Sequence, residues 1–305
     1  MIYVPIKGRI GNNLFQISAA ANLSTDFVLC ITHPSEEKYI ESFKDTLFRG
    51  ITFINGIPSN IEHYKEPFSH FNKIPYQEGK DIILDGYFQS YKYFNEKDVQ
   101  SKFAMNEDTK RVIEELYGNI LKGETTSINI RRGDYLKQPH RHPFCGIKFY
   151  RDAINFIGKD KNFIISSDDI NWCKKKFIGK NFHFVENSTP LIDLYIQTVC
   201  NNNIISNSTF SWWGAFLNLN PNKIVIVPSL WYGIDCKGLN TKDLFPPSFI
   251  ILKNRYSIIR YIHAQYLYCK NRVGKFIPFY YSVRDRYYKF RGIKKKTMYD
   301  EDNNK

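Results

Sequence analysis

Short runs of β-branched and aromatic residues alternate with segments of helical spacing along most of this chain. Near its start, residues 1–6 predict a strand, residues 14–24 a helix rich in small apolar side chains, and residues 27–32 a second strand. The stretch "GRIGNN" between the first strand and the helix predicts a glycine-bearing turn. This strand–helix–strand opening is typical of an α/β domain.

A second, longer series follows, whereas residues 34–77 show no clear pattern. Its predicted strands cover 125–130, 162–169, 182–186, the run "NNNII" and 223–228; its predicted helices cover 107–121, 149–158, 170–177, 190–200 and the segment after "SNST". Strands that alternate with helices imply parallel sheets, and ligands of such sheets gather at the carboxyl ends of the strands.

Length and composition suit two domains, or one large α/β unit with an appendage, since the chain has 305 residues of which 43% are hydrophobic. The six cysteines are scattered and none forms a CxxC pair, which predicts reduced thiols. The opening residues lack the layout of a secretion signal, and no apolar run has the length of a membrane-spanning helix. We therefore expect a cytoplasmic protein, with a peripheral position on the cytoplasmic membrane face as the alternative.

Positive charge is concentrated at the C-terminal end. Residues 253–305 carry 14 Lys and Arg against 4 Asp and Glu, a net charge of +10 out of +13 for the chain. The tail from 254 to 296 also contains many tyrosines and phenylalanines, a composition that suits an anionic membrane surface. The alternative is a helix packed on the body with a solvated basic face. A nucleic-acid-binding module is a rival of another class, but no nucleic-acid motif accompanies the tail and we expect no such partner.

Three polar clusters each follow a predicted strand of the second series: "RRGDY", "SSDDINW" and "SNSTFSWWG". The arginine pair suits a phosphate group, because the guanidinium fork binds phosphate oxygens bidentately. Hydroxyls and backbone N–H groups that open the helix after "SNST" offer a second anion-binding device. The alternative is that Arg131 and Arg132 pair internally with Asp134 and Asp168.

Other features have plainer interpretations. "GRIGNN" is not GxGxxG, and spacing alone favours a tight turn. "HRH" (His140 to His142) lacks a third metal ligand and predicts a solvated loop, and no DxD triplet occurs within residues 1–299, so no metal is expected. Trp212 and Trp213 predict core packing at a helix start.

Taken together, these stretches resemble glycosyltransferase family 11, the α-1,2-fucosyltransferases. The matching text is "GRIGNNLFQ", "INIRRGDY", "FIISSDDINWC", "DLYIQTVCNNNIISNSTFSWWGAFLN" and "NTKDLFPPSFIIL". The resemblance implies a GT-B fold of two Rossmann-like domains with parallel sheets, to which the chain adds a basic helical C-terminal extension. We expect an N-terminal, acceptor-side domain over 1–124, a donor-binding domain over 125–252 and the basic aromatic tail over 253–305.

The resemblance also assigns residues. Arg131 matches the family arginine that holds the donor pyrophosphate, and Asp193 resembles an acid that recognises guanine. The family histidine of the arginine motif falls on Asn129, which cannot act as a base or carry charge. The expected donor-binding residues are Gly11, Asn12, Gln16, Asn129, Arg131, Arg132, Asp168, Asp193, Asn207, Ser208, Thr209 and Ser211.

The implied reaction is inverting transfer of L-fucose from GDP-β-L-fucose to a galactoside hydroxyl in an α-1,2 linkage, in glycan or surface polysaccharide synthesis. GDP-fucose is a co-substrate, and no metal or other cofactor is expected. Arg131 would stabilise the departing GDP. Asp134 is the candidate general base, with an acid of the first domain as the alternative. Another linkage or another GDP-sugar remains open, and the galactose-containing acceptor could be lipid-linked.

Overall fold

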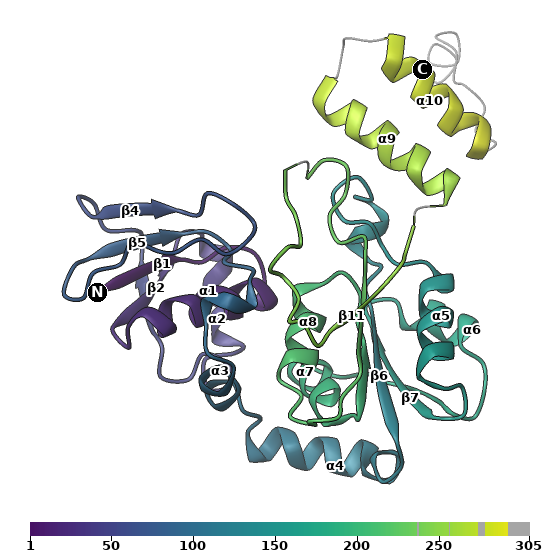
Figure 1. Ribbon diagram of the computed structural model, residues 1–305, viewed down its shortest axis with the longest axis horizontal. Coiled ribbons are helices and arrows are strands. Elements are labelled where there is room, and N and C mark those ends of the chain that lie inside the picture. Colours follow the sequence, from purple (N-terminus) through teal and green to yellow (C-terminus); the bar gives the residue numbers. More distant parts are fainter. Residues whose placement is uncertain (237, 256, 274–277, 292–305) are drawn as a thin grey trace, which may run out of the picture.

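The structure, a computed structural model, describes residues 1–236, 238–255, 257–273 and 278–291. In these residues the chain forms two β-sheets surrounded by helices, followed by two helices near the C-terminal end (Figure 1). All strand pairs are parallel, as β-strands joined through helices require. The two Rossmann-like units of a GT-B arrangement are therefore confirmed.

The first sheet has five strands in the order β3-β2-β1-β5-β4. Its elements are β1 (Ile2–Pro5), α1 (Ile10–Leu23), β2 (Phe27–Ile31), α2 (Pro34–Glu41), β3 (Thr52–Asn55), β4 (Glu62–Lys65), β5 (Ile82–Asp85), η1 (Tyr91–Tyr93) and α3 (Glu96–Lys102). The predicted strands β1 and β2 are confirmed, and β1 lies at the centre because its side chains are largely buried.

One prediction for this unit needs correction, and the structure adds elements where the sequence predicted none. Helix α1 begins at Ile10 and not at Leu14, so Gly11 and Asn12 lie in its first turn and not in the preceding turn. Residues 34–77, which show no clear hydrophobic pattern, contain α2, β3 and β4. Both strands are short and lie at the sheet edges with few buried side chains, so they lack the apolar pattern on which strand prediction depends.

The second sheet has six strands in the order β11-β10-β9-β6-β7-β8. Its elements are α4 (Glu107–Leu121), β6 (Thr125–Ile130), η2 (Asp134–Leu136), α5 (Ile147–Ile157), β7 (Asn162–Ser167), α6 (Ile170–Lys176), β8 (Phe182–Phe184), α7 (Pro190–Val199), β9 (Asn202–Ile204), α8 (Thr209–Phe216), β10 (Val225–Pro228) and β11 (Ile250–Leu252). The predicted series is confirmed, and β11 adds an edge strand beyond the last predicted one. Helix α4, which links the two sheets, packs on α7.

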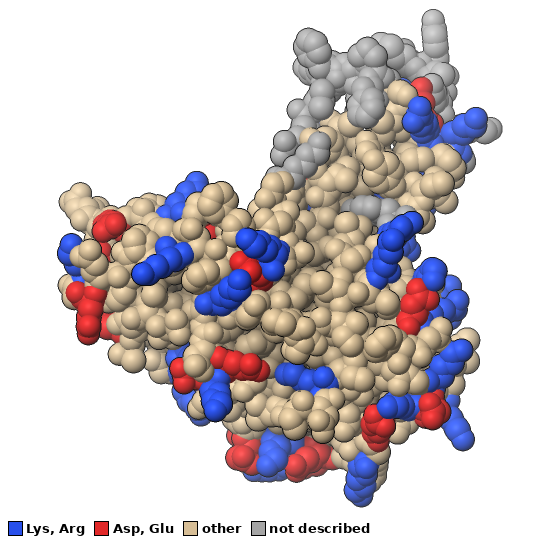
Figure 2. Space-filling view, in the orientation of Figure 1, with Lys and Arg blue, Asp and Glu red and all other residues tan. Residues whose placement is uncertain are grey.

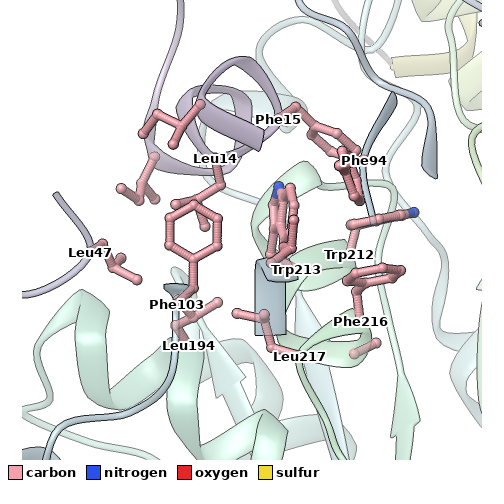
Figure 3. Close-up of a cluster of buried hydrophobic side chains, with 14 of the residues drawn as sticks. Leu14, Phe15, Leu47, Phe94, Phe103, Leu194, Trp212, Trp213, Phe216 and Leu217 are labelled. Carbon is pink, nitrogen blue, oxygen red and sulfur yellow. The ribbon is translucent and has the colours of Figure 1, made fainter. Parts of the chain in front are cut away.

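The hydrophobic core runs across both units. Trp212 and Trp213 of α8 are fully buried, and their rings lie 4.5 and 4.8 Å from the ring of Phe15 in α1. Phe94 and Phe103 complete the same cluster (Figure 3). The expectation that the tryptophan pair packs in a core is confirmed, and this core joins the two units.

The tail is helical where the structure describes it, with α9 (Ile258–Val273) and α10 (Pro278–Arg291). Residues 292–305, which include the predicted basic run 294–296, lie outside the described residues. Of the helices in the described ranges, none is both long and apolar enough to cross a bilayer. The expectation of a cysteine set without disulfides is confirmed.

Candidate active site

The three polar clusters meet at one edge of the second sheet. They follow β6, β7 and β9, and β6 lies between the other two strands. Because all three strands are parallel, their carboxyl ends bring residues 131–135, 168–172 and 206–211 together, as expected from the sequence.

Arg131 is held by two carboxylates. Its Nη1 lies 3.0 Å from Asp168 Oδ2 and its Nη2 lies 2.7 Å from Asp134 Oδ1. Asp168 is fixed in place, because its Oδ1 accepts a hydrogen bond from the Arg132 backbone N–H at 2.8 Å. A Cβ at Gly133 would lie 2.6 Å from Asp168 Oδ2, so only glycine admits this carboxylate. The internal pairing that the sequence left open is thus present at Arg131, and Asp168 orients the guanidinium.

Asp134 is the looser of the two partners. It belongs to the single turn η2, and its side chain is 43% exposed, against 24% for Asp168. An exposed ion pair of this kind is weak, so an anionic ligand can displace Asp134 at little cost while Asp168 keeps Arg131 in position.

Arg132 turns away from Arg131 and has a different role. Its Nε pairs with Asp169 Oδ2 at 3.0 Å, and its guanidinium carbon lies 3.8 Å from the centre of the Trp172 ring. Since consecutive residues leaving a strand point to opposite sides, only one of the two arginines reaches the strand-end crevice. Arg132 is buried and holds α6 against the sheet edge.

Tyr135 connects Arg131 with the start of α8. Its ring centre is 5.6 Å from the Arg131 guanidinium carbon, and its hydroxyl donates to the Asn207 carbonyl at 3.0 Å. Burial raises the pKa of Tyr135 and Arg131 opposes the shift, so the phenol stays protonated as a donor. The "RRGDY" motif contains this residue, yet nothing in the sequence indicated that it spans the crevice.

The start of α8 lacks a side-chain cap. Ser208 occupies the N-cap position but makes no side-chain capping hydrogen bond, so neither its hydroxyl nor the first-turn N–H groups are used in a side-chain cap. A helix N-terminus in this state carries partial positive charge directed outward. Arg131 and the α8 N-terminus, joined through Tyr135, therefore offer donors from two directions.

Three expected donor ligands are instead buried in a hydrogen-bond network beneath the crevice. Asn129 donates from Nδ2 to Ser166 Oγ at 3.0 Å and accepts from Ser206 Oγ at 3.2 Å, which ties the ends of β7 and β9 to β6. Ser211 donates to backbone carbonyls, and Asn207 Nδ2 donates to the Trp231 carbonyl at 3.1 Å. Where the family has a histidine, this chain therefore has a buried amide that joins three strands.

The first unit reaches the site through α1. Asn12 Oδ1 accepts hydrogen bonds from Thr209 Oγ1 at 3.0 Å and from Gln89 Nε2 at 2.9 Å. Gln89 Oε1 in turn accepts from the Tyr232 hydroxyl at 3.2 Å. This chain of side chains crosses between the units twice, and its members Gln89 and Tyr232 gave no signal in the sequence.

Gln16 serves the first unit alone. Its Nε2 donates to the carbonyls of Pro5 and Gly86, and its Oε1 accepts from Lys7 N–H and Asn13 Nδ2. Every hydrogen-bonding position of this amide is used. Gln16 therefore aligns the ends of β1 and β5 beneath the site.

Gly11 is required by the contact between α1 and α8. A Cβ at this position would lie 2.5 Å from the Phe210 backbone nitrogen and 2.6 Å from the Thr209 carbonyl carbon. Trp213 Nε1 also donates to the Gly11 carbonyl at 2.8 Å. The glycine thus permits the close approach of the two helix starts.

We expect Gly11→Ala to lower the free energy of unfolding by about 1–3 kcal/mol, because the added methyl group meets backbone atoms that cannot move aside. Gly118→Ala is the matched control: Gly118 also lies in a helix, has nothing within 4 Å of an added Cβ, and should gain up to about 1 kcal/mol from helix propensity. Urea denaturation of both variants measures the difference. Equal effects would contradict the proposed close contact.

Asp193 contacts residues that lie outside the three strand-end clusters. It lies in the first turn of α7, accepts a hydrogen bond from Ser188 Oγ at 2.6 Å, and has Tyr117 of α4 nearby. Burial raises the pKa of Asp193, and the Ser188 hydrogen bond opposes the shift.

Glu66 is an acid of the first unit that the sequence did not indicate. It follows β4, and its Oε2 accepts hydrogen bonds from the backbone N–H groups of Tyr87 and Phe88 at 2.7 and 2.9 Å. Burial raises the pKa of Glu66, and these two hydrogen bonds oppose the shift. A carboxyl group with this property at a strand end is a candidate for proton transfer.

The "HRH" stretch is not a solvated loop throughout. His140 is buried, because its carbonyl accepts a hydrogen bond from Asp235 N–H (2.8 Å) and the Arg141 carbonyl accepts one from Gly233 N–H (2.9 Å). His142 stacks on the Tyr135 ring at 4.7 Å. Across the described residues, no three His, Cys, Asp or Glu side chains gather in a way that could hold a metal ion.

The family model for glycosyltransferase family 11 matches residues 57–242, more than half of the chain and all three strand-end clusters. The chain belongs to glycosyltransferase family 11. The match begins after α1, so Gly11, Asn12 and Gln16 lie outside the matched span.

Several characterised proteins resemble this family 11 glycosyltransferase. The O-antigen biosynthesis glycosyltransferase WbnK of Escherichia coli is 37% identical over 46% of this chain and 51% of its own length. An alpha-1,2-colitosyltransferase of Escherichia coli is 31% identical, over 54% of this chain and 60% of its own length. The human galactoside alpha-(1,2)-fucosyltransferase 1 is 24% identical, over 45% of this chain and 43% of its own length. The chain thus spans about half the length of the curated relatives it matches.

Proposed function

We propose that this family 11 glycosyltransferase transfers L-fucose from GDP-β-L-fucose to a galactoside hydroxyl, forming an α-1,2 linkage with inversion at the fucose anomeric carbon. Family membership and the names of its relatives support the sugar, the linkage and the acceptor class. The observation that carries the proposal is Arg131, oriented by Asp168 and placed with Tyr135 beside the uncapped N-terminus of α8.

Breaking the fucosyl–phosphate bond builds negative charge on the leaving diphosphate and oxocarbenium character on the sugar. Arg131 and the first N–H groups of α8 are hydrogen-bond donors held beside the place where that charge would develop. Because these donors need not rearrange during the reaction, they would lower its activation barrier. In this proposal they do so without a metal ion.

Asp134 links donor binding to proton transfer. In the structure its carboxylate forms an ion pair with Arg131 Nη2, and a donor phosphate would bind the same nitrogen. The displaced carboxylate would then be available to accept the proton of the attacking hydroxyl, late in a dissociative transition state. Glu66 of the first unit is the alternative base, because its raised pKa favours proton exchange.

A colitosyl donor is the second candidate, favoured by the 31% identity to the alpha-1,2-colitosyltransferase. The acceptor is then still a sugar hydroxyl, and the same Arg131 and α8 groups would bind the diphosphate. The two candidates differ only at the sugar.

A donor screen tests the proposal. We expect turnover with GDP-fucose or a colitosyl donor and none with GDP-mannose or UDP-sugars, on a panel of β-galactosides in the presence of EDTA. NMR of the product then reads the linkage and the anomeric configuration. Turnover with a UDP-sugar alone would overturn the proposed donor. A retained anomeric configuration would overturn the proposed inversion, and complete loss of activity in EDTA would overturn the proposed metal independence.

A further inference from the structure

Helices α9 and α10 form an antiparallel hairpin. The Tyr287 ring stacks on both His263 (4.7 Å) and Tyr266 (4.9 Å), so the late part of α10 lies beside the early part of α9. Apart from this mutual packing the hairpin stands away from the two sheets (Figure 1). The alternative from the sequence, a tail helix laid along the body, does not describe this arrangement.

The hairpin is anchored at its base. The Arg260 guanidinium carbon lies 4.1 Å from the centre of the Phe144 ring, and a Cβ at Gly146 would lie 2.8 Å from Arg260 Nη1. The Arg132 guanidinium carbon also lies 5.8 Å from the centre of the Phe144 ring. The hairpin is therefore joined to the unit that contains Arg131.

Large apolar side chains are exposed at this base. Because the helices are antiparallel, the start of α9 and the end of α10 come to the same end of the hairpin. The exposed side chains there are Ile258, Ile259 and Phe290, with Ile258 71% exposed. We call these three residues the base patch.

Four exposed basic side chains, which we call the basic rim, flank the base-patch residues along the chain. Lys253 and Arg255 precede α9, and Lys289 and Arg291 end α10; all four are exposed. Asp285 is the acid of the described tail, and it pairs with Arg284 at 3.2 Å. Figure 2 shows basic side chains on the described part of the hairpin and just below it.

We propose that the base patch and its basic rim dock on an anionic membrane surface. Exposed isoleucine and phenylalanine side chains insert at the boundary between headgroups and acyl chains, while lysine and arginine pair with anionic headgroups. Nucleic acid would use the positive charge but gives aliphatic side chains no apolar medium to enter. Docking would hold the active site close to lipid-linked acceptors, but the membrane contact itself does not depend on the donor or the linkage.

Flotation of the full chain with vesicles tests this proposal. We expect binding to vesicles of phosphatidylglycerol mixed with phosphatidylcholine, weakening as salt is added, and no binding to phosphatidylcholine alone. The double variant Ile258→Glu/Ile259→Glu and the double variant Lys253→Glu/Arg255→Glu should each bind at least roughly tenfold more weakly. Ile178→Glu is the matched control, because Ile178 is exposed on the body, and it should bind like the unchanged chain.

Thermal unfolding of each variant establishes that the fold is intact, and turnover on a soluble acceptor should be unchanged. Equal vesicle binding by both double variants and the unchanged chain would overturn the proposal. Two other outcomes would also overturn it. One is a chain that does not bind anionic vesicles but retards DNA or RNA in a gel. The other is a chain that does not bind vesicles but self-associates, with the self-association abolished in the base-patch variant.

Discussion

Replacing Arg131 with alanine is expected to lower turnover with GDP-fucose by about 10²–10³-fold, the usual loss when a fixed donor to a developing negative charge is removed. Asp168 would remain, and with no guanidinium beside it that carboxylate would also repel the leaving diphosphate. Steady-state kinetics with GDP-fucose and a β-galactoside measure the effect. The Arg131→Lys variant should recover only part of the activity, because an ammonium group cannot bridge Asp168 and a phosphate in one plane.

Arg111→Ala is the matched control. Arg111 forms an ion pair with Asp108 at the same three-residue spacing, but this pair is exposed on α4. Its loss should leave turnover unchanged. Turnover like that of the unchanged chain in Arg131→Ala would remove the central assignment of the proposed function.

Replacing Asp134 with asparagine is expected to separate binding from chemistry. GDP should bind several-fold more tightly, because the carboxylate that competes for Arg131 Nη2 is gone. Turnover should fall by roughly 10²-fold or more if Asp134 accepts the acceptor proton. Calorimetric titration with GDP and steady-state kinetics measure the two effects on the same sample.

The control is Asp108→Asn, the acidic half of the exposed pair on α4, which should change neither quantity. Unchanged turnover in Asp134→Asn would transfer the base assignment to Glu66, and Glu66→Gln should then lower turnover and remove the acidic limb of its pH profile. Unchanged GDP affinity would mean that Asp134 does not compete with the donor.

The strand ends of the second unit could be predicted from the sequence, because short runs with β-branched residues are each followed there by a polar cluster. Residues 125–130 are such a run, and every residue of this strand is buried. Once these strands were assigned, the convergence of residues 131–135, 168–172 and 206–211 followed from the parallel arrangement alone.

The functions of single side chains within those clusters could not be predicted in the same way. Arg131 and Arg132 are identical letters one position apart, yet one faces the crevice and the other packs on Trp172. Gly11 is needed because of Thr209 and Phe210, about two hundred positions further on. Contacts between residues so distant in sequence leave no periodic signal. For the same reason the sequence does not indicate the hydrogen bonds of Gln89 and Tyr232.

The tryptophan pair of α8 has a consequence for how such enzymes can diverge or be recombined. Trp212 and Trp213 pack against Phe15 and Phe94 of the first unit as well as Phe216 of their own helix, so this part of the core is filled only when both units are present. A chimaera that takes the first unit from one relative and the second from another must carry these aromatic positions as a matched set. An exchange of residues 34–77 is under the same constraint, because Phe43, Leu47 and Phe48 are buried in this core and must be retained with the set.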